Sequence, residues 1–206
     1  MIKSRFELDR ISVKLGISFA RFGLTPNTWT VLALLPALAG FIALYHGNLL
    51  VSLILFIISG AFDAVDGSVA RVTGSVTELG AFLDGVIDRY VEILLYIGLF
   101  FYLSNRGIFF LFDSGIWIIL LVYGAIMPSF IRAYADHRGV ITEVKQQRQM
   151  GGLLERAERL TLLYAGMLAG LFEGMWLMYV VVLAALLANL TAFQRIIYVL
   201  RKANRS

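Results

Sequence analysis

DAVDGSVARVTGSVTELGAFLDGVID, residues 63–88, is the stretch that decides the fold of this chain. Strongly apolar sequence lies on both sides of it, LILFIISGAF before and YVEILLYIGLF after. Within it, the segment RVTGSVTE is polar, small and β-branched, and Gly74 with Ser75 forms a natural break. The stretch therefore predicts two antiparallel helices that are joined by a short turn.

Each predicted helix carries two aspartates. Asp63 and Asp66 are three residues apart, and Asp84 and Asp88 are four apart, so each pair lies on one helix face. An ionised aspartate inside a membrane helix costs about 2.5–3.5 kcal/mol on insertion scales, and clustered carboxylates repel one another. Divalent cations offset both effects, and an oxygen-only ligand set favours Mg²⁺, Mn²⁺ or Ca²⁺ over zinc. A solvated helix–turn–helix with surface acids is the alternative, but the apolar flanks argue against it.

Composition indicates an all-α integral membrane protein. Of the 206 residues, 59% are hydrophobic and 16% are charged, and the mean hydropathy is +0.80. The length fits one domain over residues 1–206. The chain has no cysteine, which excludes disulfides and thiolate metal sites. The start, MIKSRFELDRISVKLG, lacks an apolar core and a small-residue cleavage site, so we expect no signal peptide.

The apolar segments predict six transmembrane helices over residues 25–206, after a juxtamembrane segment over residues 1–24. Residues 2–21 mix apolar with basic residues, as an amphipathic helix on an anionic membrane surface does; a disordered basic leader is the alternative. The fifth helix is expected to start near Gly152, because its apolar run alone is short for a bilayer. The six apolar segments cover about residues 28–45, 49–71, 77–103, 115–135, 160–172 and 175–200.

Short polar segments mark the ends of these helices. Thr25 or Asn27 is able to cap the first helix, and Pro36 is tolerated inside it because neighbouring helices absorb a kink. The turn His46-Gly47-Asn48 precedes the second helix, and the longest polar stretch, residues 136–159, precedes the fifth.

The distribution of basic residues predicts the orientation in the membrane. With six helices, all of the 18 Lys and Arg residues except Arg89 and Arg106 fall on one side. Cytoplasmic loops carry such an excess, so both termini and the aspartate end are expected to face the cytoplasm. We therefore predict a protein of the cytoplasmic membrane whose site lies where lipid and water-soluble substrate meet, and we expect no nucleic-acid partner.

Eight residues of the stretch fit one spaced pattern, D-x2-D-G-x2-A-R-x8-G-x3-D-x3-D: Asp63, Asp66, Gly67, Ala70, Arg71, Gly80, Asp84 and Asp88. At every fixed position this resembles the signature of the CDP-alcohol phosphatidyltransferases. The resemblance implies a metal-dependent enzyme of phospholipid biosynthesis, which transfers the phosphatidyl or archaetidyl group of a CDP-linked lipid to a polar alcohol and releases CMP. It also implies two divalent ions, Mg²⁺ or Mn²⁺, and a homodimer.

The resemblance assigns roles to the four aspartates. As in the family, Asp63, Asp66 and Asp84 are expected to be metal ligands. Asp88 is expected to bind the second metal and to act as the general base on the acceptor hydroxyl. Two cations among carboxylates suit phosphoryl transfer, since they bind the diphosphate and stabilise its developing charge.

The same stretch supplies the expected contacts to the CDP-linked lipid. Arg71 is suited to neutralise a phosphate. The glycines let a bulky anion approach the backbone, although small-residue helix packing is the alternative. Thr77 holds the nucleotide, as Ser or Thr does in the family, or caps the following helix, and the two roles are compatible. The expected set is Asp66, Gly67, Ala70, Arg71, Thr77 and Gly80.

Four arginines are candidates for binding the acceptor: Arg132, Arg156, Arg159 and Arg195. The segments GLLERAERL and LTAFQR resemble those of the subfamily that makes phosphatidylinositol phosphate or its archaeal ether-lipid counterpart. There, basic residues of these segments bind the phosphate of inositol phosphate, which is therefore the expected acceptor; glycerol phosphate, serine or another alcohol is the alternative. The polar segment Val140–Met150 departs from the family by its length.

Two other function classes fit the residues less well. A divalent-cation transporter, the remote alternative, predicts acids distributed across the bilayer, whereas these acids cluster toward one face. A non-catalytic binding module would tolerate the loss of a signature residue, and none is missing. For Arg201, Lys202 and Arg205, the excess of positive charge at cytoplasmic helix ends is a sufficient explanation.

Overall fold

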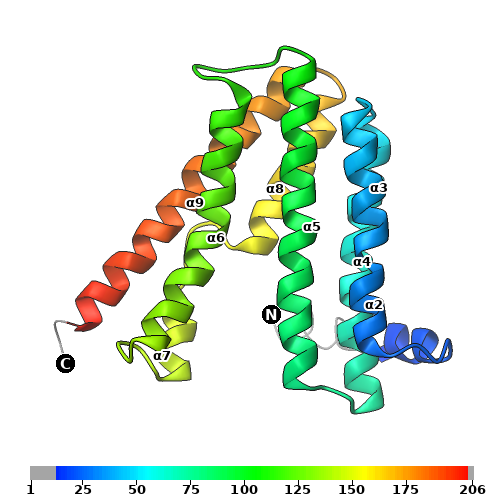
Figure 1. Cartoon of the computed structure of the whole chain (residues 1–206), viewed down its shortest axis with the longest axis vertical. Coiled ribbons are helices and arrows are strands. Elements are labelled where there is room, and N and C mark those ends of the chain that lie inside the picture. The colour runs from blue at the N-terminus through cyan, green and yellow to red at the C-terminus, as the bar shows by residue number, and fades with distance from the viewer. Residues whose placement is uncertain (1–12, 204–206) are drawn as a thin grey trace. The chain divides into compact units, whose positions relative to one another are not determined.

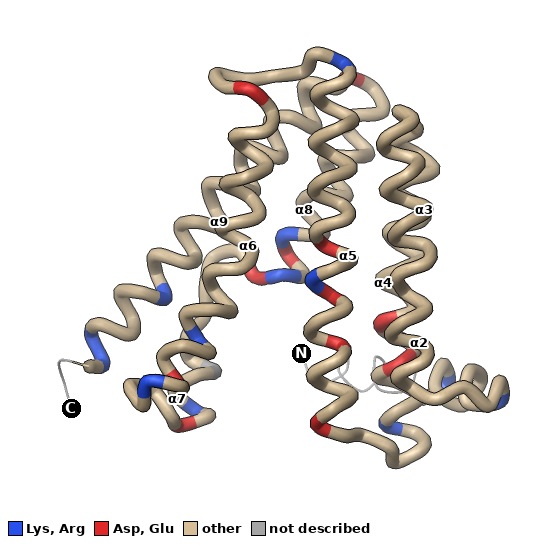
Figure 2. Tube along the Cα trace, in the orientation of Figure 1, with Lys and Arg blue, Asp and Glu red and all other residues tan. Residues whose placement is uncertain are grey.

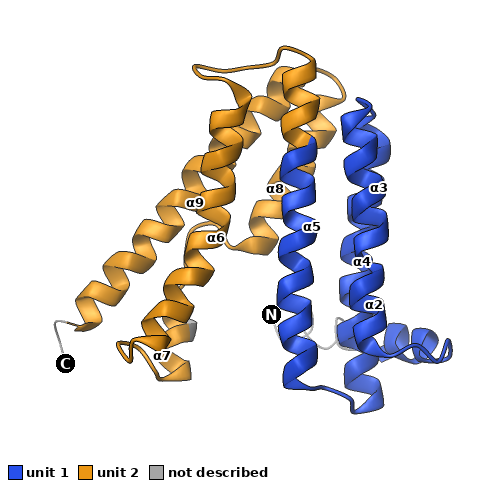
Figure 3. Ribbon diagram, in the orientation of Figure 1, with its two compact units in different colours: residues 1–98 blue, residues 99–206 orange. Residues whose placement is uncertain are grey.

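The computed structural model describes residues 13–203 (Figure 1). These residues form helices and turns without any strand, apart from an isolated bridge between Phe110 and Phe112, which confirms the predicted all-α class. The chain divides into two compact units, Met1–Gly98 and Leu99–Ser206, with the boundary inside helix α5 (Glu78–Asn105; Figure 3).

In unit 1, helices α2 (Pro26–Leu32) and α3 (Leu34–Tyr45) follow one another and pack on α4 (Leu49–Thr73; Figure 1). Thr25 caps α2, because its Oγ1 accepts a hydrogen bond of 3.3 Å from the N–H of Thr28. The break between α2 and α3 has a local cause, since Pro36 has no N–H to donate to the carbonyl one turn earlier. The predicted first helix is therefore present with a proline-induced irregularity.

The turn between α4 and α5 lies where the sequence predicts it. Helix α4 ends at Thr73, and its C-cap Gly74 has a φ of +65°, a left-handed conformation that favours glycine. The N–H of Gly80 donates a 3.0 Å hydrogen bond to Oγ1 of Thr77, which confirms Thr77 as the cap of α5. Acidic residues of both helices consequently lie near this turn (Figure 2).

The helix over residues 13–20 packs on the second half of α4 through Gly16. A Cβ at Gly16 would lie 2.5 Å from the carbonyl oxygen of Ser68 and 2.6 Å from a methyl of Val72, so only glycine permits this approach. Of the amphipathic helix predicted over residues 2–21, residues 2–12 lie outside the described part.

In unit 2, helix α9 (Gly174–Ala203) packs against both α6 (Ser114–His137) and α8 (Arg156–Gly170). Small residues permit these contacts, since a Cβ on Gly124 would meet Ala188 at 2.8 Å and one on Gly166 would meet Val180 at 2.6 Å. The short helix α7 (Val144–Gln149) lies within the polar segment that sequence analysis left without a helix. Its flanks are buried in a small core made of Ala135, Ile141 and Met150, with Tyr198 and Val199 packed against it.

Within residues 13–203, four helical segments are long and apolar enough to cross a membrane: Pro26–Tyr45, Leu49–Thr73, Ser114–His137 and Gly174–Ala203. They correspond to the first, second, fourth and sixth predicted spans. Helix α5 does not belong to this group because it carries too many charged residues. Helix α8 does not belong to it because it is only 15 residues long. Helix α8 also begins at Arg156 rather than near Gly152, so the predicted start of the fifth helix was wrong by about one turn.

Candidate functional site

Three of the four signature aspartates come together in unit 1. Asp63 and Asp66 on α4 and Asp84 on α5 each offer a carboxylate oxygen, and these oxygens lie within 4.8 Å of one another. Asp66 is buried, with 6% of its surface exposed, and the other two are half-buried. Three converging carboxylates suit a hard divalent cation, which prefers oxygen ligands and offsets their mutual repulsion. The donor set therefore fits Mg²⁺ or Mn²⁺.

Asp88 lies one helical turn beyond Asp84 on α5 and is half-buried. It does not belong to the group of three within the described residues. Its predicted roles, as a ligand of a second metal and as general base, therefore remain predictions.

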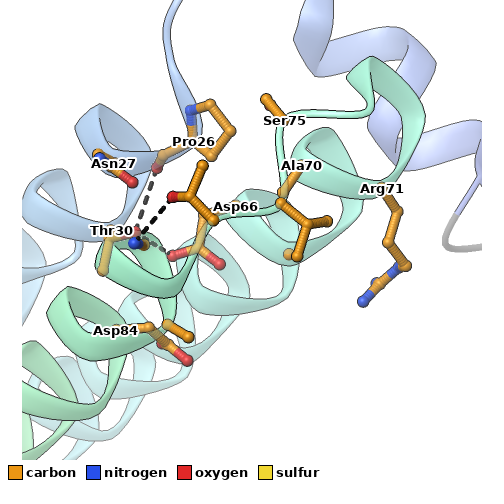
Figure 4. Close-up of a pocket in the computed structure, with 13 residues that line it drawn as sticks. Pro26, Asn27, Thr30, Asp66, Ala70, Arg71, Ser75 and Asp84 are labelled. Atoms are coloured by element: carbon orange, nitrogen blue, oxygen red, sulfur yellow. Dashed lines mark hydrogen bonds between the residues drawn. The ribbon is translucent and has the colours of Figure 1, made fainter.

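A pocket of about 210 Å³ adjoins the three aspartates in unit 1 (Figure 4). Two of those aspartates line it, as do all the residues that the sequence assigns to the CDP-linked lipid. Figure 4 shows Asn27 and Thr30 on one side of it and Ala70 and Arg71 on the other. The predicted residues in its lining are Asp66, Gly67, Ala70, Arg71, Thr77, Gly80 and Asp84. The lining adds Pro26, Asn27, Thr30, Ser75, Val76 and Ala81.

The glycines of the signature make room for polar side chains of the pocket. A Cβ on Gly67 would lie 3.5 Å from Nη1 of Arg71, whose Nη2 donates a 3.3 Å hydrogen bond to Oγ of Ser68. A Cβ on Gly80 would lie 3.1 Å from Oγ1 of Thr77 and 3.2 Å from Oδ1 of Asn27. A Cβ at Gly80 would therefore be tight against two groups that line the pocket, whereas a Cβ at Gly67 would make an ordinary van der Waals contact with Arg71.

Thr30 orients the most buried aspartate and was missed by sequence analysis. Its hydroxyl donates a 2.5 Å hydrogen bond to Oδ2 of Asp66, and Thr30 is only 5% exposed (Figure 4). The hydroxyl also lies 3.1 Å from the carbonyl oxygen of Pro26. The contact to Asp66 fixes one carboxylate oxygen, as outer partners of metal ligands do.

Replacing Thr30 by valine should lower the affinity for Mn²⁺ by about 10-fold or more, because Asp66 loses this partner. Titration of the purified protein with Mn²⁺ measures the effect. Thr28→Val is the matched control, since it removes a hydroxyl of the same helix that contacts Thr25 at 2.8 Å and not Asp66. Equal affinities in the two variants would contradict an orienting role for Thr30.

A half-buried ion pair lies further along α5, within unit 1. Arg89 Nη1 donates to Glu92 Oε2 at 2.7 Å, and the Tyr96 hydroxyl donates to Glu92 Oε1 at 2.7 Å. Glu92 is 2% exposed and Tyr96 is 1% exposed. The arginine that sequence analysis left inside the third helix therefore has its counter-ion one turn away.

Unit 2 carries the four candidate acceptor arginines on three helices, α6, α8 and α9. Arg195 on α9 is 5% exposed, and Arg132 on α6 is close enough to interact with it electrostatically. Arg195 donates to the carbonyl oxygen of Pro128 at 2.8 Å and to Oε1 of Glu155 at 3.3 Å. Glu155 is the residue before α8, whose first turn carries the other two arginines, Arg156 and Arg159.

The segment before α8 is bound directly to α9. The N–H of Leu153 donates to Oε1 of Gln194 at 3.2 Å, and the N–H of Leu154 donates to Oγ1 of Thr191 at 3.0 Å. Gly152 packs so closely on Thr191 that a Cβ there would overlap its methyl group. These contacts hold the segment before α8 on α9 in a non-helical conformation, and α8 starts at Arg156, later than predicted.

Comparison with known proteins finds one matching family and several similar proteins. The sequence model of a family described as CDP-alcohol phosphatidyltransferase matches residues 23–193. An archaetidylinositol phosphate synthase of Methanothermobacter thermautotrophicus is 33% identical over 181 residues, which cover 87% of this chain and 85% of that protein. A phosphatidylinositol phosphate synthase of Mycobacterium tuberculosis is 31% identical over 193 residues, which cover 86% of this chain and 82% of that protein.

Solved structures of a phosphatidylinositol phosphate synthase of Mycobacterium tuberculosis share the fold. The crystal structure with CDP-DAG bound has a TM-score of 0.77 and 26% identity, and the match covers 92% of this chain and 94% of that chain. The crystal structure in complex with manganese and citrate also has a TM-score of 0.77, with 88% of that chain covered.

Proposed function

This chain belongs to the CDP-alcohol phosphatidyltransferase family, and we propose that it transfers the lipid phosphoryl group of a CDP-linked lipid to inositol phosphate. The observation that carries the reaction class is the group of three aspartate carboxylates within 4.8 Å beside a pocket lined by signature residues. The acceptor is supported by the four arginines of unit 2 and by the relatives, which are named as inositol phosphate lipid synthases.

In the proposed enzyme, two divalent ions are bound. Asp63, Asp66 and Asp84 are metal ligands, and Asp88 is a ligand of the second ion. Mg²⁺ and Mn²⁺ both suit these ligands, and the manganese complex of the relative supports this class of ion. The ions would supply charge stabilisation to the diphosphate. Thr30 keeps Asp66 oriented, and Arg71 offers its guanidinium to a phosphate of the nucleotide.

Asp88 performs the proton transfer in this proposal. It accepts the proton of the acceptor hydroxyl as the hydroxyl oxygen forms a bond to the phosphorus that bears the lipid. The bond from that phosphorus to the CMP oxygen breaks, and CMP leaves. Gly67, Ala70, Thr77 and Gly80 surround the nucleotide, since they line the pocket.

The arginines of unit 2 bind the phosphate of the acceptor. Arg132, Arg156, Arg159 and Arg195 exceed the acids Glu155 and Glu158 of the α8 start by two positive charges. A phosphate monoester carries about −1.5 to −2 at pH 7, which balances this excess. A neutral alcohol such as free inositol does not.

We also propose the membrane arrangement expected from the sequence. Six helices span the bilayer as one domain, with α5 and α8 joining the four apolar segments, and an amphipathic helix precedes them on the membrane surface. The distribution of basic residues favours an orientation with both termini and the aspartates on the cytoplasmic side of the cytoplasmic membrane. The enzyme acts as a homodimer, as family members do.

Purified protein supplied with CDP-lipid and Mn²⁺ or Mg²⁺ should release CMP with inositol phosphate, because this acceptor offers a hydroxyl for the attack and a phosphate whose charge matches the arginines. Glycerol phosphate, serine and inositol are tested separately by the same CMP measurement. If CMP were released only with glycerol phosphate or only with serine, inositol phosphate would be the wrong acceptor, and the proposed reaction class would still hold.

Two arginine variants of α9 test the binding of the acceptor. Arg195→Gln should raise KM for inositol phosphate by about 10-fold or more, because a hydrogen bond to a charged partner is lost. Arg201→Gln removes an exposed charge from the last turn of the same helix and should leave KM unchanged. Equal KM values in both variants would remove Arg195 from acceptor binding.

A further inference from the structure

The ion pair between Glu155 and Arg195 joins a half-exposed acid to a buried base. The two side chains are 51% and 6% exposed, and the N–O distance is 3.3 Å. An ion pair with one solvated partner and a long distance is weak, because the carboxylate keeps much of its hydration outside the pair. Glu155 is therefore the more solvated partner, and its side chain also accepts a hydrogen bond from the N–H of Glu158 in the capping box of α8.

Arg195 is held in place independently of Glu155. Its Nη1 donates to the carbonyl oxygen of Pro128 at 2.8 Å. Within the described residues, Nε of Arg195 and Nε of Arg132 are both buried without a hydrogen-bond partner. Buried donors are normally satisfied, so two guanidinium groups with unused donors indicate a site that is completed by a further acceptor.

A phosphate group competes well with a single carboxylate for such donors. It offers three acceptor oxygens and up to two charges, so it binds several arginines at once. A carboxylate or another small monoanion offers less charge and fewer oxygens. Displacing Glu155 is therefore easier for a phosphate monoester than for an alcohol such as serine, which carries one carboxylate and no net charge at about pH 7.

We propose that Glu155 is a specificity-determining residue, which occupies Arg195 until the acceptor's phosphate displaces it. The inference rests on the proposed function, because it assigns a role within the acceptor site. Glu155 substitutes for the acceptor's phosphate on Arg195, so the buried guanidinium is paired in the absence of acceptor. Competition with this carboxylate then selects acceptors that carry a phosphate.

Binding of inorganic phosphate, measured by calorimetry on the purified full-length protein, tests the proposal. Glu155→Gln should bind phosphate about 5-fold more tightly than the wild type, since the competing charge is gone. Glu155→Asp should act in the same direction, because its shorter side chain does not reach Arg195 in the same way. KM for inositol phosphate should fall in parallel.

Glu158→Gln is the matched control. Glu158 lies in the same turn, and its Oε2 accepts a 2.6 Å hydrogen bond from the N–H of Glu155. A glutamine keeps this acceptor while removing the same charge. The proposal expects little change in phosphate affinity for this variant.

Equal phosphate affinities in Glu155→Gln and Glu158→Gln would overturn the proposal, because net charge alone would then explain the effect. The absence of phosphate binding in all proteins would overturn it as well. CMP release with inositol phosphate, measured on the same preparations, shows separately whether the proposed function stands.

Discussion

Replacing Asp66 by asparagine is expected to reduce CMP release by about 1000-fold, because the group of three loses its most buried carboxylate. The loss corresponds to about 4 kcal/mol of transition-state stabilisation, within the several kcal/mol that a bound metal supplies. Direct titration should show Mn²⁺ binding weakened to the same degree. The amide oxygen still accepts a hydrogen bond from Thr30, so the local packing is kept.

Thermal unfolding separates this effect from misfolding. Without metal the variant should be at least as stable as the wild type, because one of three mutually repelling carboxylates is gone. Mn²⁺ at about 100 times its Kd should stabilise the wild type by about 2.7 kcal/mol and the variant much less. Asp113→Asn makes the same chemical change at the cap of α6, where asparagine is an equally good cap, and should alter neither quantity. If Mn²⁺ stabilised Asp66→Asn as much as the wild type, Asp66 would not be a metal ligand.

Asp88→Asn is expected to lower transfer by about 100-fold to 10,000-fold, the range for removal of a general base. The CDP-linked lipid should still bind, because the residues that line the pocket and the group of three aspartates are untouched. Single-turnover CMP release measures transfer, and equilibrium binding of the CDP-linked lipid measures the first step.

The number of Mn²⁺ ions bound then distinguishes the two roles of Asp88. A general base that is also a ligand of the second ion should lose one ion together with activity. Asp113→Asn again serves as the control for the exchange of an acid for an amide. Turnover near the wild-type rate in Asp88→Asn would remove this residue from the chemistry.

The sequence was sufficient for those features whose causes are local. The spacing of the aspartates, the glycine at the end of α4 and the hydroxyl of Thr77 each act within a few residues of their own position. Their geometry follows from helix periodicity and from capping. The α4–α5 turn, and the approach of carboxylates across it, could therefore be predicted.

The features that sequence analysis missed depend on contacts between distant segments. Thr30 meets Asp66 across 36 positions, and Leu154 meets Thr191 across 37. No periodicity within one segment encodes such a pair. The late start of α8 has the same origin, because side chains of α9 bind the non-helical segment that precedes it.

The ion pair of α5 forms between residues of one helix, so it does not depend on the tertiary fold. Arg89 and Glu92 are three residues apart, so they meet as soon as that part of the chain coils. Tyr96 adds its hydroxyl from the following turn. The acid and the base of this helix are thus paired within a single turn, so this part of α5 can coil with its charges already neutralised by each other.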